Sequence, residues 1–253
     1  MSSEPIHNEF TTADAIKIHF MTLGEGVPVI LIHGYTANAE DKWFKTGVAQ
    51  ELARTNRVIA IDARGHGRSE KPHDPGQYGP QMAEDVIELM DHLDIEKAHI
   101  HGFSMGGGIT TQLLARHQHR IITASYGGSG VRETDPEWLA QVPEDEERDN
   151  SREQAARDAL QASVYRDNEA LQAVRAYPWQ EGEQGRIDLT QITVPVLSIN
   201  GSLDKPNAKT HRMARELANF HCYVLPERGH LTSVEQGSPY TALLVDFITL
   251  YNP

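Results

Sequence analysis

The stretch that decides the fold reads AHIHGFSMGG, residues 98–107. Its first four residues are typical of a short strand, and the residues after 107 have the spacing of a helix that runs to about residue 117. Ser104 therefore lies at a turn between a strand and a helix, inside a G-x-S-x-G pattern. Glycine at 102 and 106 removes the Cβ atoms that would collide where the two elements cross closely. A glycine-rich turn with an incidental serine is the alternative interpretation.

Strands and helices alternate on both sides of this turn. Short apolar runs predict strands that are buried on both faces, and amphipathic spacing predicts helices between them. Strands separated by helices imply a mostly parallel, twisted sheet with helices on both faces, here after an N-terminal hairpin. The predicted strands are 10–12, 16–22, 27–32, 58–61, 98–101, 121–126, 194–199 and 222–225, and the other predicted helices are 41–54, 80–93 and 239–251.

The alternation stops between about residues 131 and 190. That segment has no strand-like run, and its pattern favours two or three helices. It holds fifteen acidic residues against seven arginines and no lysine. We predict a helical lid at 131–190, inserted into a core made of 1–130 and 191–253. The acidic run 144–147 is interpreted as a solvated surface, with repulsion of anionic substrates and adaptation to a salty habitat as alternatives.

Two further polar residues follow late strands. His230 comes after the strand 222–225, and Asp204 comes after the strand 194–199. The order Ser104, Asp204, His230 is the order of nucleophile, acid and base in hydrolases that carry the serine on a strand-to-helix turn. Asp62 is the rival acid, but it precedes the serine and lies beside the run RGHG, residues 64–67. His33 and His66 also precede the serine, and we expect them to bond loop backbone.

Acyl transfer needs two preorganised N–H donors for the developing oxyanion. We predict the backbone N–H groups of Tyr35 and Met105 for this oxyanion hole. Met105 follows the nucleophile directly, and Tyr35 follows a flexible glycine, Gly34, after the strand 27–32. The ring of Tyr35 is also a candidate for the substrate pocket, with a surface tyrosine as the alternative.

Composition excludes several functions. The net charge of −13 argues against nucleic-acid binding and weakly against anionic membranes. No signal peptide and no run long enough to span a bilayer is present, so we expect a cytoplasmic chain. Cys222 is the only cysteine, and we expect it to be buried in a strand.

No zinc-ligand spacing occurs in the sequence, so we predict no metal and no cofactor. The sequence does not decide between a monomer and a homodimer.

Together these motifs resemble the α/β-hydrolase superfamily over almost the full length. The resemblance rests on His33-Gly34, on DARGHGRS at 62–69, on GFSMGG at 102–107, on GSLD at 201–204 and on Gly229-His230. It implies the α/β-hydrolase fold. Within the superfamily the chain is similar to small bacterial esterases, enol-lactonases and cofactor-free haloperoxidases. Meta-cleavage-product hydrolases usually carry Trp where this chain has Leu231, and haloperoxidase-like proteins often carry Trp in place of Tyr35.

The expected function is cleavage of a small carboxylic ester or lactone through an acyl-enzyme, with a Ser-His-Asp triad. The first alternative is hydrolysis of a C–C bond in a meta-cleavage-type diketone acid, for which Arg175 or Arg186 could hold the carboxylate. The second alternative is a small-molecule receptor on the same fold. Of the large apolar residues in the lid we select Trp138, Tyr177 and Trp179, beside Tyr35, as candidate substrate contacts.

Overall fold

A mostly parallel sheet of eight strands forms the centre of the computed structural model, which describes residues 4–145, 151–161, 164–177 and 187–253. The strand order is β1-β2-β4-β3-β5-β6-β7-β8. The first two strands form the predicted hairpin, β2 also pairs antiparallel with β4, and the remaining pairs are parallel. The strands are β1 (Ile6–Thr11), β2 (Lys17–Leu23), β3 (Val27–Ile32), β4 (Asn56–Ile61), β5 (Ala98–Phe103), β6 (Ile121–Gly127), β7 (Val196–Gly201) and β8 (Phe220–Leu225).

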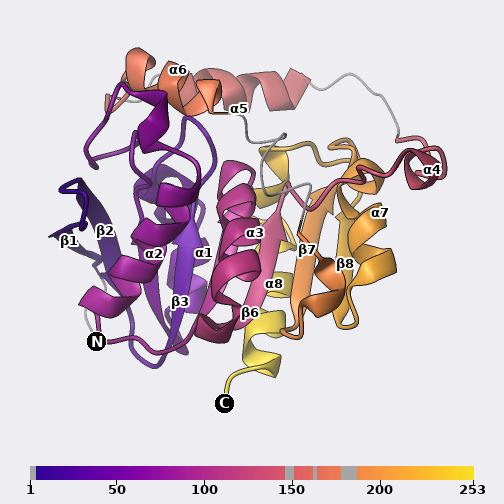
Figure 1. Ribbon diagram of the computed structural model, residues 1–253, viewed down its shortest axis with the longest axis horizontal. Coiled ribbons are helices and arrows are strands. Elements are labelled where there is room, and N and C mark those ends of the chain that lie inside the picture. The colour runs from indigo at the N-terminus through magenta and orange to yellow at the C-terminus, as the bar shows by residue number, and fades with distance from the viewer. Residues whose placement is uncertain (1–3, 146–150, 162–163, 178–186) are drawn as a thin grey trace.

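Helices cover both faces of this sheet, as Figure 1 shows. On one face lie α2 (Pro80–His92), α3 (Met105–His117) and α7 (Pro206–Glu216), and on the other lie α1 (Val48–Leu52) and α8 (Tyr240–Leu250). Each set of helices covers its own apolar cluster. In β3, Ile30 and Ile32 belong to one cluster, while Val29 and Leu31 belong to the other. Because successive side chains of a strand point to opposite faces, this division confirms the predicted two-sided burial.

The described part of residues 131–190 contains helices and no strand. It holds α4 (Pro136–Leu139), α5 (Ser151–Gln161) and α6 (Asn168–Ala176), and α5 and α6 cross above the carboxyl ends of the strands (Figure 1). The hydroxyl of Tyr35 donates to the carbonyl oxygen of Leu171 over 2.9 Å, which ties α6 to the loop after β3. Short 3₁₀ segments lie at Pro75–Gln77, Gln118–Arg120, Leu189–Gln191 and Thr232–Val234.

Two local predictions were wrong. The single helix expected at 41–54 is a π-helical turn, Glu40–Phe44, followed by α1. Gly47 separates them because its φ of 84° lies in the left-handed region and ends the first turn. Cys222 is exposed rather than buried. It lies on β8, which is the last strand of the sheet, so no further strand covers it.

Candidate active site

Ser104 stands at the tip of the turn between β5 and α3. Its φ of 54° and ψ of −111° are a strained combination for a residue with a side chain. The N–H of Ser104 donates to the carbonyl oxygen of Gly127 over 2.8 Å, which holds the turn in place. A Cβ at Gly102 would lie 2.1 Å from the carbonyl oxygen of Gly106, and one at Gly106 would lie 2.2 Å from that of Ile32. The structure therefore confirms that both glycines permit a close crossing.

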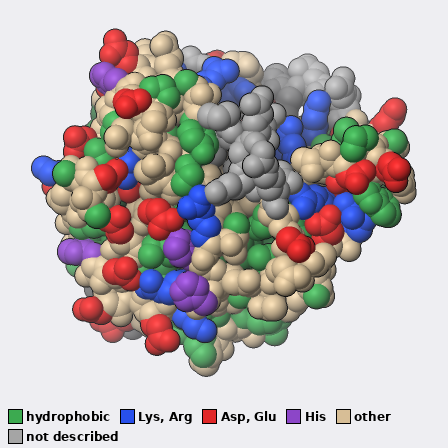
Figure 2. All heavy atoms as spheres, viewed as in Figure 1, with side chains coloured by type: hydrophobic (Ala, Val, Ile, Leu, Met, Phe, Trp, Pro, Cys, Tyr) green, Lys and Arg blue, Asp and Glu red, His purple; other side chains and the backbone are tan. Residues whose placement is uncertain are grey.

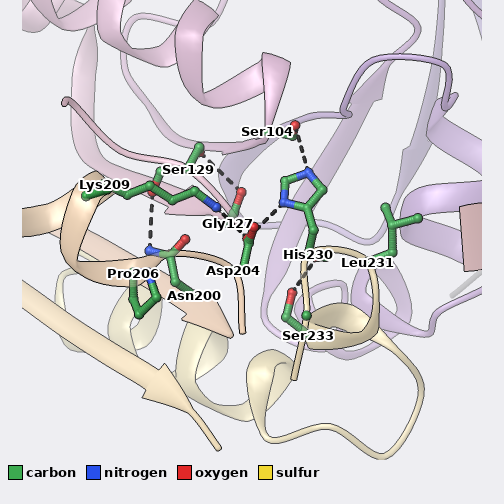
Figure 3. A network of polar contacts seen from close by, with 12 residues as sticks. Ser104, Gly127, Ser129, Asn200, Asp204, Pro206, Lys209, His230, Leu231 and Ser233 are labelled. Carbon is green, nitrogen blue, oxygen red and sulfur yellow. Dashed lines mark hydrogen bonds and ion pairs between the residues drawn. The ribbon is translucent and has the colours of Figure 1, made fainter. Parts of the chain in front are cut away.

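His230 enters the site from the loop after β8. The ring of Phe103 lies 5.0 Å from the imidazole, centroid to centroid. A Cβ at Gly128 would come within 2.9 Å of Nδ1, so the missing side chain there leaves room for the ring. The hydroxyl of Ser233 donates to the carbonyl oxygen of His230 over 2.9 Å (Figure 3). These contacts aim the imidazole at the carboxyl edge of the sheet.

Ser104, His230 and Asp204 meet at this edge, as Figure 3 shows. Nε2 of His230 lies 2.9 Å from Oγ of Ser104, and Nδ1 lies 2.8 Å from Oδ2 of Asp204. Burial alone would raise the pKa of Asp204, but the hydrogen bond and charge of His230 and the charge of Lys209 hold it below its usual range. An ionised Asp204 fixes the proton of the neutral imidazole on Nδ1. Nε2 can then accept a proton from the serine hydroxyl.

The backbone at Tyr35 and Met105 adjoins the serine. Met105 is the first residue of α3, so its N–H has no acceptor within the helix. A Cβ at Gly34 would lie 3.2 Å from the Cβ of Ser104, which shows how closely the loop after β3 passes. Ile32 and Gly102 are partners in the register of β3 and β5, so both loops leave the sheet at the same level. The oxyanion role of these two amides stays a prediction.

His33 and His66 bond loop backbone, as predicted, and the rival acid Asp62 also bonds loop backbone. Nδ1 of His33 lies 2.8 Å from the carbonyl oxygen of Gly34, and Nε2 of His33 accepts the N–H of Ala63 over 3.1 Å. Nδ1 of His66 lies 3.1 Å from the carbonyl oxygen of Arg64. Burial lowers the pKa of His66 to about 3, so this ring is neutral at physiological pH. Asp62 accepts hydrogen bonds from backbone N–H groups of Ala39 and Arg68 and lies against His19.

A cavity of about 1050 Å³ opens above Ser104. Arg132, Arg157, Arg175 and Lys205 give its wall a basic character, and several Lys and Arg side chains gather in the upper right of the face in Figure 2. The apolar or aromatic described residues that line it are Tyr35, Met105, Val131, Leu139, Val142, Val174, Leu203 and Ala208.

The described candidates for substrate contact do not all line the cavity. Tyr35 lines the cavity. Trp138 instead lies against the guanidinium of Arg215, 4.3 Å from the ring centroid, and the ring of Tyr177 packs against Gly79. Neither Trp138 nor Tyr177 is among the described residues that line the cavity, so we do not include them in the substrate-binding site. Trp179 and Arg186 lie outside the described residues.

Three charged residues near the triad were missed in the sequence. Nζ of Lys209 lies 2.6 Å from Oδ2 of Asp204. Glu153 of α5 is buried, and its carboxylate accepts the N–H groups of Leu231 and Thr232, directly after His230. Nζ of Lys42 lies 3.5 Å from the centroid of the Phe103 ring, and burial lowers the pKa of this lysine to about 7. The contacts of Glu153 and Lys42 depend on tertiary packing between segments that are far apart in the sequence. Lys209 follows Asp204 by only five residues, but no motif singled it out.

Within the described residues, no cluster of three or more His, Cys, Asp or Glu side chains is arranged to hold a metal ion. No helix among them is long and apolar enough to cross a membrane.

Comparison with known proteins gives a consistent result. Residues 27–167 match the family model described as the alpha/beta hydrolase fold. A 2-hydroxymuconate semialdehyde hydrolase of Pseudomonas sp. strain CF600 is 28% identical, and the match covers 93% of this chain and 92% of that protein. A putative non-heme haloperoxidase of Mycobacterium phage D29 is 34% identical over 47% of this chain, and that match spans only 41% of the phage protein.

Two solved structures are similar over nearly the whole chain. The enol-lactonase of Burkholderia xenovorans LB400 has a TM-score of 0.78 and 25% identity, covering 96% of this chain and 100% of the other. Est816, described as an N-acyl homoserine lactone degrading enzyme, has a TM-score of 0.74 and 28% identity, covering 95% of this chain and 100% of the other.

Proposed function

Because this chain belongs to the alpha/beta-hydrolase fold family, we propose that it is a serine hydrolase that cleaves a small carboxylic ester or lactone through an acyl-enzyme. The observation that carries the proposal is the contact of 2.9 Å between Oγ of Ser104 and Nε2 of His230, made on a strained turn beside a cavity. The similarity to an enol-lactonase and to Est816 supports the substrate class.

In the proposed reaction, Nε2 of His230 takes the hydroxyl proton of Ser104 while Oγ attacks the carbonyl carbon of the substrate. The negative charge that develops on the carbonyl oxygen is held by the N–H groups of Tyr35 and Met105. Asp204 stabilises the imidazolium that forms. The imidazolium then protonates the leaving alcohol, and the C–O bond breaks to leave the acyl group on Ser104.

Water completes the reaction by the same route in reverse. His230 takes a proton from water, and the hydroxide attacks the acyl carbon. When the tetrahedral intermediate collapses, the proton returns to Oγ of Ser104 and the carboxylic acid leaves. Apart from the substrate and water, these proposed steps use side chains and backbone amides of the chain.

The described part of residues 131–190 forms the roof of the substrate pocket in this proposal. Leu139, Val142 and Val174 come from this segment and line the cavity, which supports the assignment. These apolar side chains, which lie beside Arg132, Arg157 and Arg175 of the same segment, suit a modest acyl group or a lactone ring better than a polymer.

One observation favours a second candidate, hydrolysis of a C–C bond in a diketone acid. Arg175 lines the cavity and could pair with a substrate carboxylate. The relative named as a 2-hydroxymuconate semialdehyde hydrolase supports this alternative.

A substrate panel separates the two candidates. We expect turnover of p-nitrophenyl acetate, p-nitrophenyl butyrate and small lactones to exceed turnover of a meta-cleavage ring-fission product. The Ser104→Ala variant should lose at least about several hundredfold in kcat/KM, as triad knockouts do. Near-normal turnover of esters by this variant would remove Ser104 from its role, and preference for the ring-fission product would favour the second candidate.

A further inference from the structure

Lys209 contacts the same carboxylate oxygen that receives the imidazole. Oδ2 of Asp204 lies 2.6 Å from Nζ of Lys209 and 2.8 Å from Nδ1 of His230. Figure 3 shows the lysine side chain extending toward Asp204 from the side opposite His230. The side chain of Lys209 is only 9% exposed and that of Asp204 is 13% exposed, so solvent screens this pair weakly.

The packing of α7 fixes this lysine. A Cβ at Gly130 would lie 2.3 Å from the carbonyl oxygen of Lys209, so α7 passes directly against the loop after β6. The first turn of α7 is also anchored, because the carboxylate of Asp145 accepts the N–H groups of Asn207 and Ala208. The backbone of Lys209 is therefore held beside Asp204 by a packed helix.

We propose that Lys209 is a positioning residue for the reaction: its ammonium fixes the Asp204 carboxylate and offsets part of the negative charge that faces His230. This inference rests on the proposed serine-hydrolase function. The ammonium reduces the net negative charge at the Asp204 end of the proposed triad. Its removal is therefore expected to change the pH dependence of turnover.

The pKa directions agree with this arrangement. Burial would raise the pKa of Asp204, yet His230 and Lys209 together lower it, so the carboxylate is ionised. Burial lowers the pKa of Lys209, and the charge of Asp204 works in the opposite direction. The other charged groups around the pair are Arg132, Glu133 and Lys205 on the cavity wall, Asp145 between α4 and α5 in the chain, and Glu153 and Arg157 on α5.

The test is the pH dependence of kcat/KM for a small ester in four forms: the wild type, K209M, K209Q and K209R. K209M removes the charge and the donor, K209Q keeps a donor without charge, and K209R keeps the charge. We expect the acid limb of K209M and K209Q to move to higher pH by about one unit, because a charge within a few ångströms shifts a titration by that order. The acid limb of K209R should stay near that of the wild type.

Arg212→Met is the matched control, since Arg212 lies on the same helix in a part-buried ion pair with Glu216 and is not among the described residues that line the cavity. It should leave the acid limb in place. If K209M does not fold, K209Q and K209R carry the test.

An acid limb of K209Q that coincides with that of the wild type overturns the inference, as does an equal displacement in K209R. The Ser104→Ala variant, measured in the same assay, separates a failure of the proposed serine-hydrolase function from a failure of the role proposed for Lys209. An active Ser104→Ala variant contradicts the proposed function, whereas an inactive one with an unmoved K209Q profile contradicts only the role of Lys209.

Discussion

Glu153 links the helix α5 to the loop that carries His230, and its removal should affect both stability and turnover. Its two carboxylate oxygens lie 2.8 Å and 2.9 Å from the N–H of Leu231, and one of them lies 3.2 Å from the N–H of Thr232. The residue is 4% exposed, so water cannot replace these hydrogen bonds easily.

The magnitude follows from counting buried donors. In Glu153→Gln the amide oxygen can replace the carboxylate oxygen that contacts both N–H groups, while the NH₂ group then faces the N–H of Leu231 and has no acceptor there. One unsatisfied buried donor costs about 1–3 kcal/mol. In Glu153→Ala both donors lose their partner, which costs roughly twice as much. For a chain of this size, a loss of ~2 kcal/mol lowers the melting temperature by about 4–8 °C.

Turnover should also fall, because residues 231 and 232 continue directly from the base. A displacement of about 1 Å at a catalytic group can cost on the order of a hundredfold. We therefore expect kcat of Glu153→Ala to drop by about tenfold or more at a temperature where the variant is folded.

The assay is urea denaturation followed by circular dichroism, with steady-state ester hydrolysis on the same samples. Glu137→Gln is the matched control, since Glu137 is an exposed carboxylate on α4. If Glu153→Gln unfolds within ~0.3 kcal/mol of the wild type and Glu153→Ala keeps its kcat, the reasoning about this buried contact is refuted.

Two further predictions concern the nucleophile turn and a buried histidine. Gly102→Ala should lower the free energy of unfolding, measured by urea denaturation, by more than ~3 kcal/mol, because the new Cβ would lie 2.1 Å from a carbonyl oxygen. In the control Gly47→Ala the new Cβ meets no atom within 4 Å but the residue keeps a positive φ, so the loss should be only ~1 kcal/mol. Equal losses in the two variants would contradict the argument. Burial lowers the pKa of His66 to about 3, so between that pH and 6.5 the unfolded chain binds a proton at this histidine and the folded chain does not. The free energy of unfolding therefore falls as the pH drops below 6.5. In His66→Asn, which keeps a donor near the Nδ1 position, the stability difference from the wild type should shrink by ~2 kcal/mol between pH 7 and pH 5; a constant difference would refute the neutral buried ring.

The fold could be predicted in most of its elements because apolar periodicity sets burial directly. Val27–Ile32 is continuous in apolar residues. It pairs with β4 on one side and β5 on the other, and its side chains are buried on both faces of the sheet. The helix at 41–54 was mispredicted because the apolar spacing of Trp43, Phe44, Val48 and Leu52 ignores the backbone. These side chains are all buried, yet Gly47 breaks the helix between them.

The three residues proposed as the triad could be brought together from sequence because each follows a strand, and parallel strands end at the same edge. Their charged neighbours could not. Glu153 is 78 residues from Leu231 in the chain, and its contact depends on where α5 settles. Lys209 lies only five residues after Asp204, at the start of α7, but no motif of the sequence marks it as the partner of that carboxylate.

Covalent labelling tests the central claim most directly. An activated serine reacts with a fluorophosphonate, and the adduct adds a defined mass to the peptide that carries it. The account predicts one adduct, on Ser104, with none in Ser104→Ala and labelling of His230→Ala slowed by about a hundredfold or more. A stable adduct at another residue with Ser104 unmodified, or labelling of the wild type no faster than that of His230→Ala, would contradict it.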